Sequence, residues 1–270
     1  MIYFYKDHHI YYRVKGSGVP LVFLHGLPLD SDIWEPVIEK LGLHFQCISL
    51  DFPGFGRSKS EHDVSMNFSD LKEMVHGLLK SLKIESCMLL GHSFGGYVSL
   101  DFVSKYPSFV KQLILVSTKA FEDSDIKKSE RLFFSQELMK RQYASYLHLQ
   151  LGSCLSGGNY DSFIKKNIET NVDWHIAKIL ESLTKRRSYI SELKKLRMPV
   201  KIIVGKRDDA FLSEAFAMYK VIPDAEIEVI PEAKHMVFLD NLEYFVTIIN
   251  RYVAYEPEAV LMKKEVFDKT

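Results

Sequence analysis

The chain lacks the features that define several classes of protein. Only 3 of its 270 residues are cysteine, too few and too scattered for a disulfide framework, so we expect a reducing, cytoplasmic compartment. No apolar run approaches the ~20 residues that a membrane helix needs, and the N-terminus has neither the apolar stretch nor the cleavage site of a signal peptide. Lys plus Arg and Asp plus Glu number 35 each. We therefore expect no membrane partner and no nucleic-acid partner.

Apolar residues are abundant, at 47% of the chain, and they occur in short runs separated by amphipathic segments. Strand-like runs precede residue 119 at four places (21–26, 45–52, 86–93 and 110–118). Helical patterns lie between them, and the alternation resumes at residue 199. This order predicts an α/β fold with a mostly parallel, doubly wound sheet covered on both faces. Aromatic and polar residues alternate around Gly16 and Gly18, which is typical of a β-hairpin.

The pattern changes between residues 119 and 198, which indicate several helices and a glycine-rich break at 151–160. We therefore expect a core domain made of residues 1–118 and 199–270, with 119–198 inserted as a helical cap, or lid, over one end of the sheet. The cap carries 15 Lys and Arg against 10 Asp and Glu. This surplus is consistent with a solvated helical surface, or with a docking site for an acidic partner or an anionic substrate.

Ser93 lies in Gly91-His92-Ser93-Phe94-Gly95, which matches the pattern G-x-S-x-G. The pattern also occurs by chance, and the alternative is a small residue in an ordinary tight loop. Here it falls where an apolar run gives way to a helical pattern, as a nucleophile elbow requires. A Cβ at position 91 or 95 would clash with the tightly turned chain. We therefore predict that Ser93 is a nucleophile, and that His92 points away across the turn.

A serine hydroxyl needs a base to remove its proton, and the chain has ten histidines. His235 follows the last predicted strand by a short loop, which places it at the same sheet edge as Ser93. The alternative is a packed or surface histidine. An acid must orient that base, and Asp208 ends a predicted strand, with Asp209 as the alternative.

An oxyanion needs hydrogen-bond donors, and two backbone N–H groups meet the requirement. Leu27 follows His25-Gly26 directly after the first predicted parallel strand, and Phe94 follows the serine. We predict that these two N–H groups form the oxyanion hole. We expect His25 to form hydrogen bonds within its loop rather than to take part in the chemistry.

These motifs together resemble the α/β-hydrolase superfamily over residues 21–254, and most closely its small bacterial esterases, lactonases and related hydrolases with a helical cap. The segments that carry this resemblance are HGLP, DFPGFGRS, GHSFGG, VGKRD and EAKHMVF. The chain order Ser93, Asp208, His235 is the order of that triad. In the family DFPGFGRS is a structural loop, so we expect Asp51 and Arg57 to brace it. At the position directly before the histidine this chain has Lys234, where relatives often have glycine.

The resemblance implies a serine hydrolase that cleaves a carboxylic ester or thioester of a small or medium acyl substrate through an acyl-enzyme. Relatives with aspartate at the elbow open epoxides or carbon–halogen bonds, so serine implies acyl transfer. We expect no cofactor and no metal. Phe121 and Met236 are the candidate walls of the substrate pocket. The other cap aromatics pack the cap or line the pocket (Phe133, Phe134, Tyr143, Tyr146, Tyr160, Phe163 and Trp174).

Two alternatives stay open. The first is an esterase similar to the pimeloyl-carrier methyl esterases, which would act on an acyl ester bound to an acidic acyl-carrier protein at the basic cap. The second is a lyase of this fold, or a relative that keeps the triad and serves as a small-molecule receptor.

Overall fold

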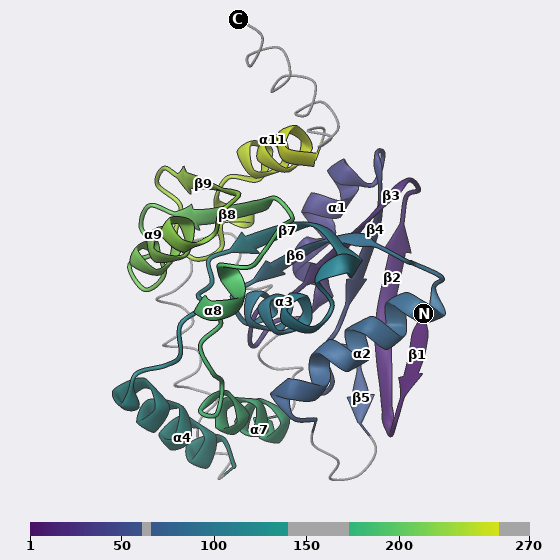
Figure 1. Ribbon diagram of the computed structural model, residues 1–270. Coiled ribbons are helices and arrows are strands. Elements are labelled where there is room, and N and C mark those ends of the chain that lie inside the picture. Colours follow the sequence, from purple (N-terminus) through teal and green to yellow (C-terminus); the bar gives the residue numbers. More distant parts are fainter. Residues whose placement is uncertain (61–65, 140–172, 254–270) are drawn as a thin grey trace, which may run out of the picture.

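The computed structural model describes residues 1–60, 66–139 and 173–253 (Figure 1). Its centre is a sheet with the strand order β1-β2-β4-β3-β6-β7-β8-β9, and β5 pairs with β2. The strands are β1 (Ile2–Tyr5), β2 (His8–Lys15), β3 (Val19–Leu24), β4 (Phe45–Leu50), β5 (Lys59–Ser60), β6 (Cys87–His92), β7 (Val110–Val116), β8 (Val200–Gly205) and β9 (Ala225–Ile230). From β4 to β9 along this order all neighbours are parallel, whereas β1, β2 and β5 pair antiparallel. The predicted α/β class and mostly parallel sheet are confirmed.

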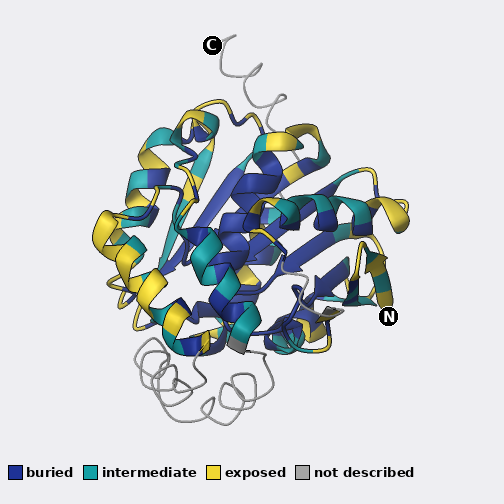
Figure 2. Cartoon of the chain, turned by 90° about the horizontal axis from the view of Figure 1, so that it is seen from below, coloured by how far each residue is buried: buried dark blue, intermediate teal, exposed yellow. Residues whose placement is uncertain are grey.

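Helices cover both faces of the sheet (Figure 1). They are α1 (Glu35–Leu41), α2 (Phe68–Ser81), α3 (Phe94–Lys105), α4 (Asp125–Met139), α7 (Asp173–Leu183), α8 (Ile190–Leu193), α9 (Leu212–Val221), α10 (Val237–Asp240) and α11 (Leu242–Val253), with short 3₁₀ turns at Ser31–Trp34 and Pro107–Phe109. One buried layer lies between the sheet and α2, α3 and α9, and the other between the sheet and α1, α10 and α11. The central strands therefore form the most buried part of the molecule (Figure 2).

Strand β3 shows why these segments become strands. Val22 and Leu24 pack into the layer under α2 and α3, whereas Leu21 and Phe23 pack into the layer under α1 and α11. Side chains alternate between the two faces of a strand, so a strand covered on both faces needs an uninterrupted apolar run. That is why such short runs predicted the central strands.

The N-terminal hairpin forms, but the predicted turn position was wrong. Its strands are β1 and β2, so the turn falls at Lys6-Asp7, where Lys6 adopts φ 50°. Gly16 and Gly18 lie in the connection from β2 to β3, and these strands are separated by β4. Both glycines have positive φ, at 80° and 111°. The glycine signal marked a real turn, but strand order decided which strands it joins.

Helices α4 and α7, which lie between β7 and β8, pack against each other, and buried charges join the loop before α4 to the segment after α7. Helices α4 and α7 are in extensive contact. In the loop before α4, the Asp123 carboxylate lies 2.6 Å from Arg131 Nε and 2.8 Å from Lys119 Nζ. The Arg186 guanidinium, fully buried like that carboxylate, lies 3.9 Å from it and donates to the carbonyl of Phe121. Burial opposes ionisation of Asp123, but Arg131 and Lys119 outweigh it and hold its pKa below the ordinary value.

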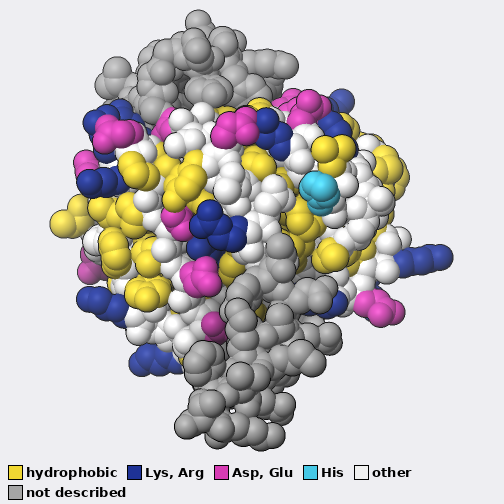
Figure 3. Space-filling view, turned by 90° about the horizontal axis from the view of Figure 1, so that it is seen from above, with side chains coloured by type: hydrophobic (Ala, Val, Ile, Leu, Met, Phe, Trp, Pro, Cys, Tyr) yellow, Lys and Arg dark blue, Asp and Glu magenta, His cyan; other side chains and the backbone are white. Residues whose placement is uncertain are grey.

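The predicted glycine-rich break at 151–160 lies outside the described residues. None of the described helices is long and apolar enough to cross a membrane. On the face seen in Figure 3, Lys and Arg side chains are interspersed with Asp and Glu side chains.

Candidate active site

Ser93 joins the end of β6 to the start of α3 in a conformation that few side chains adopt. Its φ is 51° and its ψ is −111°. Four hydrogen bonds hold it there. Its N–H donates to the carbonyl of Val116 (2.9 Å), while its carbonyl accepts from the Thr118 hydroxyl (2.7 Å) and from the N–H groups of Gly96 (3.0 Å) and Tyr97 (3.3 Å). Strain of this kind persists only where the surroundings impose it, and it is common at functional sites.

The two glycines of the motif are required by close packing, as predicted. A Cβ on Gly91 would lie 2.3 Å from Ser99 Oγ and 2.4 Å from the carbonyl oxygen of Gly95. A Cβ on Gly95 would lie 2.2 Å from the carbonyl oxygen of Leu24. Because these neighbours are mostly backbone atoms, they cannot swing aside as a flexible side chain would. The spacing G-x-S-x-G therefore follows from how tightly β6, α3 and β3 meet.

His235 and Asp208 meet at the carboxyl end of the sheet. His235 Nδ1 lies 2.9 Å from Asp208 Oδ2, and the side chains are 14% and 4% exposed. The carboxylate can only accept, so Nδ1 carries the hydrogen, and in the neutral ring Nε2 then keeps its lone pair. Asp209 is exposed. The Phe211 ring stacks on the imidazole with centroids 4.8 Å apart. Of the two aspartates that the sequence left open, Asp208 is the one that the fold brings to His235.

The loop after β3 passes beside Ser93. A Cβ on Gly26 would lie 3.2 Å from the Cβ of Ser93, so the backbone at Gly26 and Leu27 is adjacent to the elbow. Leu27 is partly buried, and Phe94 is buried at the first position of α3. Among the residues that the structure describes, neither of their N–H groups has a hydrogen-bond acceptor. Two free donors beside a strained serine are what an oxyanion hole requires.

His25 braces this loop, as expected. Its Nδ1–H donates to the carbonyl of Gly26 (3.0 Å), and its Nε2 accepts from the Phe52 N–H (3.0 Å). The Leu29 N–H donates to the same Gly26 carbonyl (2.9 Å). This carbonyl belongs to the peptide group whose N–H is that of Leu27, so the contacts set the direction of the donor. Burial lowers the pKa of His25 to about 4, against the opposing effect of Asp51.

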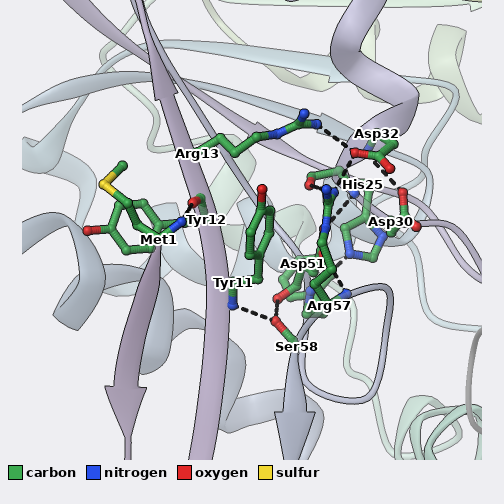
Figure 4. Close-up of polar contacts among 12 residues, drawn as sticks. Met1, Tyr11, Tyr12, Arg13, His25, Asp30, Asp32, Asp51, Arg57 and Ser58 are labelled. Atoms are coloured by element: carbon green, nitrogen blue, oxygen red, sulfur yellow. Dashed lines mark hydrogen bonds and ion pairs between the residues drawn. The ribbon is translucent and has the colours of Figure 1, made fainter.

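The DFPGFGRS loop is held by Asp51 and Arg57, as expected from the resemblance (Figure 4). Asp51 accepts hydrogen bonds from the N–H groups of Ser31 and Arg57, both at 2.8 Å. The Arg57 side chain pairs with Asp32, which also pairs with Arg13 at 2.7 Å. These contacts join the loop to the 3₁₀ turn at Ser31–Trp34, which identifies the cluster as a brace between the two.

The two candidate wall residues lie in different places. Phe121 is partly buried beside the layer under α3, and its carbonyl accepts from Arg186. Met236 is 2% exposed and packs into the opposite layer, with Trp34 and Phe238. Among the other cap aromatics, Phe133 is exposed, Phe134 and Trp174 are partly buried, and Tyr143, Tyr146, Tyr160 and Phe163 lie outside the described residues. Within the described ranges, no group of His, Cys, Asp and Glu side chains is arranged to hold a metal ion.

Sequence reasoning missed two side chains that hold the elbow and its surroundings. Thr118, just after β7, fixes the carbonyl of Ser93. His92, expected to point away, forms a hydrogen bond to the backbone carbonyl of His235 (3.1 Å). Both contacts join residues far apart in the chain, and no local pattern signals them. The order of the parallel strands is what brings these pairs together.

Comparisons with known proteins identify the family of the chain. The model of the alpha/beta hydrolase fold family matches residues 19–242. The chain is 27% identical to the pimeloyl-[acyl-carrier protein] methyl ester esterase of Pseudoalteromonas atlantica, over 86% of this chain and 93% of that relative. It is also 27% identical to the enzyme of the same name from Legionella pneumophila, over 91% of this chain and 99% of that relative.

Solved structures show the same architecture. A thermophilic esterase from Thermogutta terrifontis superposes with a TM-score of 0.84 and 25% identity, over 92% of this chain and 93% of that one. The enol-lactonase from Burkholderia xenovorans shares the fold with a TM-score of 0.85 and 18% identity, over 94% of this chain and all of that one. Together with the family match, which spans most of the sequence, these findings confirm the predicted resemblance. The chain belongs to the alpha/beta hydrolase fold family.

Proposed function

We propose that this chain is a carboxylic ester hydrolase that works through an acyl-enzyme formed on Ser93. The single observation that carries the proposal is the 2.9 Å hydrogen bond between His235 and Asp208, at the same sheet edge as the strained serine. The relatives named as esterases, which align along almost the whole chain, support the same activity. Family, fold and side-chain chemistry therefore favour one reaction class.

In this mechanism Asp208 fixes the tautomer of the base. Because Nδ1–H donates to Asp208, the Nε2 lone pair of His235 is free to remove the Ser93 proton as Oγ attacks the ester carbonyl. The buried carboxylate then stabilises the imidazolium that forms. His235 protonates the leaving alcohol, and later it activates the water that hydrolyses the acyl-enzyme.

The negative charge that develops on the carbonyl oxygen is received by the N–H groups of Leu27 and Phe94. Phe94 opens a helix of 12 residues, whose N-terminal dipole favours an anion. The Leu27 donor is oriented through the Gly26 carbonyl, which His25 and Leu29 hold in place. Donors that are aligned before the reaction need no reorganisation in the transition state.

The helical segment supplies the substrate pocket in this proposal. Residues 119–198 form a cap, or lid, over a core made of residues 1–118 and 199–270. Phe121 is its candidate wall, whereas Met236, which is 2% exposed and packs into the opposite layer, is left out of it. The acyl group is small or medium in size. The placement of the pocket is supported by the position of Phe121, which lies between β7 and the buried Asp123 cluster, where the chain leaves the sheet.

The test is labelling and turnover by matched variants. Wild-type protein should react with a fluorophosphonate probe and hydrolyse p-nitrophenyl acetate. Ser93→Ala should lose labelling and lower kcat by at least about a thousandfold, whereas Ser104→Ala on the same helix should leave both unchanged. Asp208→Asn should lower kcat by at least about a hundredfold, because the base loses its orientation, and Asp209→Asn should not. Wild-type turnover in Ser93→Ala would refute the proposal.

A carrier-bound acyl ester is the second candidate substrate. Two relatives at 27% identity carry the name pimeloyl-[acyl-carrier protein] methyl ester esterase, and the proposed cap has a surplus of basic residues. An acidic carrier attracted by that surplus would associate less readily as salt rises. Hydrolysis of a carrier-bound methyl ester should then fall steeply between 50 and 500 mM salt, while hydrolysis of a free ester stays level. Equal salt dependence would favour a free small-molecule ester.

A further inference from the structure

His92 occupies the position between the elbow and the loop that carries His235. It is the last residue of β6, is 1% exposed and directly precedes Ser93. Its Nε2 lies 3.1 Å from the backbone carbonyl oxygen of His235. A carbonyl oxygen can only accept, so Nε2 carries the hydrogen and the ring is the Nε2–H tautomer. The residue beside the nucleophile therefore donates a hydrogen bond to the backbone of the base.

This bond complements the contact that Asp208 makes. Asp208 holds the imidazole of His235 at Nδ1, but it does not hold the backbone from which the imidazole projects. The loop is also held one residue earlier, where the Lys234 N–H donates to Asp240 at 2.8 Å. At His235 itself, the backbone carbonyl is held by His92. The end of β6 therefore holds both residues: Ser93 follows it directly in the chain, and the His235 backbone is hydrogen-bonded to its last residue, His92.

The His92 ring is locked by its packing. It contacts the rings of His235, Phe238 and Trp34 at centroid distances of 4.8, 5.1 and 6.3 Å. On another side lies Gly26, where a Cβ would come within 2.7 Å of His92 Nδ1. Nδ1 is buried and has no hydrogen-bond partner in the described part of the chain. One imidazole therefore fills the space between the loop of the Leu27 donor and the loop of the base.

His92 also stays uncharged beside a base that gains charge. Burial, followed by the neighbouring His235, places the pKa of His92 well below its ordinary value. A neutral ring does not repel the imidazolium that forms on His235 during the reaction. A cation of similar size at this position would oppose that step.

We propose that His92 is a positioning residue, whose Nε2–H bond to the carbonyl of His235 sets the place of the catalytic base relative to Ser93. The inference rests on the proposed function. Loss of the bond frees the backbone of the base from the elbow, and misplacement of a reacting group by about 1 Å costs on the order of 10²-fold in rate. The loss should appear in kcat, because His92 contacts the base and not the solvent-facing side of the site.

The experiment compares two substitutions at one position with a packing control. His92→Phe keeps a planar ring but removes the donor, and His92→Gln keeps an N–H at the distance of Nε2. Phe245→Leu removes a buried ring of the same layer, which packs on Phe238 with centroids 5.7 Å apart, and leaves the His92 donor and its neighbouring rings in place. For each variant we would measure Tm, the rate of phosphonylation by the fluorophosphonate probe, and kcat and KM for p-nitrophenyl acetate.

We expect His92→Phe to lower kcat and the phosphonylation rate by about ten- to a hundredfold with KM within about twofold, and His92→Gln to stay within about threefold of wild type. Phe245→Leu should lower Tm and leave kcat per folded molecule unchanged. Wild-type kcat in His92→Phe, or an equal loss in the phenylalanine and glutamine variants, would overturn the inference. A wild-type protein without labelling or turnover would instead refute the proposed function.

A measurement on the wild type covers the case in which His92→Phe does not fold. Nitrogen-15 NMR of histidine-labelled protein distinguishes the two neutral tautomers, and the His92 signals are assigned by their loss in His92→Gln. We expect the Nε2–H tautomer from pH 6 to pH 8. The Nδ1–H tautomer, or a charged ring in this range, would overturn the inference without any kinetic measurement.

Discussion

Replacing Asp123 with asparagine removes the negative charge that faces Lys119, Arg131 and Arg186, and leaves the shape of the side chain almost unchanged. The Asp123 and Arg186 side chains are fully buried, and those of Lys119 and Arg131 are 15% and 11% exposed. The cations would then lie close together in a medium that solvates them poorly. Removal of one partner from a buried ion pair costs about 3–5 kcal/mol, mostly because the other charge is left uncompensated.

A loss of this size is large enough to measure as a shift in Tm. For a chain of this size each kcal/mol shifts Tm by about 2–4 °C, so Asp123→Asn should lower Tm by roughly 6–20 °C. Because the folded-state pKa of Asp123 lies below its ordinary value, the ion-pair stabilisation is complete at pH 7, and it is lost only as the pH falls below about 4 and through the folded-state value. Calorimetry at pH 7 and low salt therefore measures the full effect.

The matched control is an ion pair of similar length at the surface. Lys127 and Glu130 on α4 are 2.8 Å apart and 47% and 46% exposed. Glu130→Gln should change the free energy of unfolding by less than about 1 kcal/mol, because water screens such pairs. A Tm for Asp123→Asn within about 2 °C of wild type would refute the reasoning that this buried carboxylate holds α4 and the segment after α7 together.

Two further predictions concern the loop after β3 and the elbow. Because burial lowers the pKa of His25 to about 4, the unfolded chain binds more protons than the folded chain below about pH 6.5, and His25 alone should cost about 3 kcal/mol of stability between pH 7 and pH 4. Urea unfolding at several pH values checks this, and a flat profile over that range would contradict it. Gly95→Ala would place a Cβ 2.2 Å from the Leu24 carbonyl oxygen, so we expect a loss of soluble protein or a Tm lowered by at least about 5 °C. A normal Tm in circular dichroism melting would show that β3 and α3 can move apart.

Local patterns identified the strands and the elbow because their causes are local. Runs such as residues 21–24 are apolar on both faces, since a central parallel strand is covered on both sides. Gly91 and Gly95 were recognised as sterically required, and the close approaches found there explain why. The hairpin turn was misplaced at Gly16 and Gly18 because two separate turns lie near each other, and only strand pairing shows which one closes β1 on β2.

Chain order and motif spacing by themselves determined that a serine, two adjacent aspartates and a histidine follow strands whose ends share one edge of a sheet. Tertiary structure decided that Asp208, and not Asp209, lies against the imidazole of His235. It also decided that His92 reaches a carbonyl 143 residues away. The physical reason is that a parallel sheet aligns strand ends from distant parts of the chain, while a shift of one residue in a loop turns a side chain toward its partner or toward water.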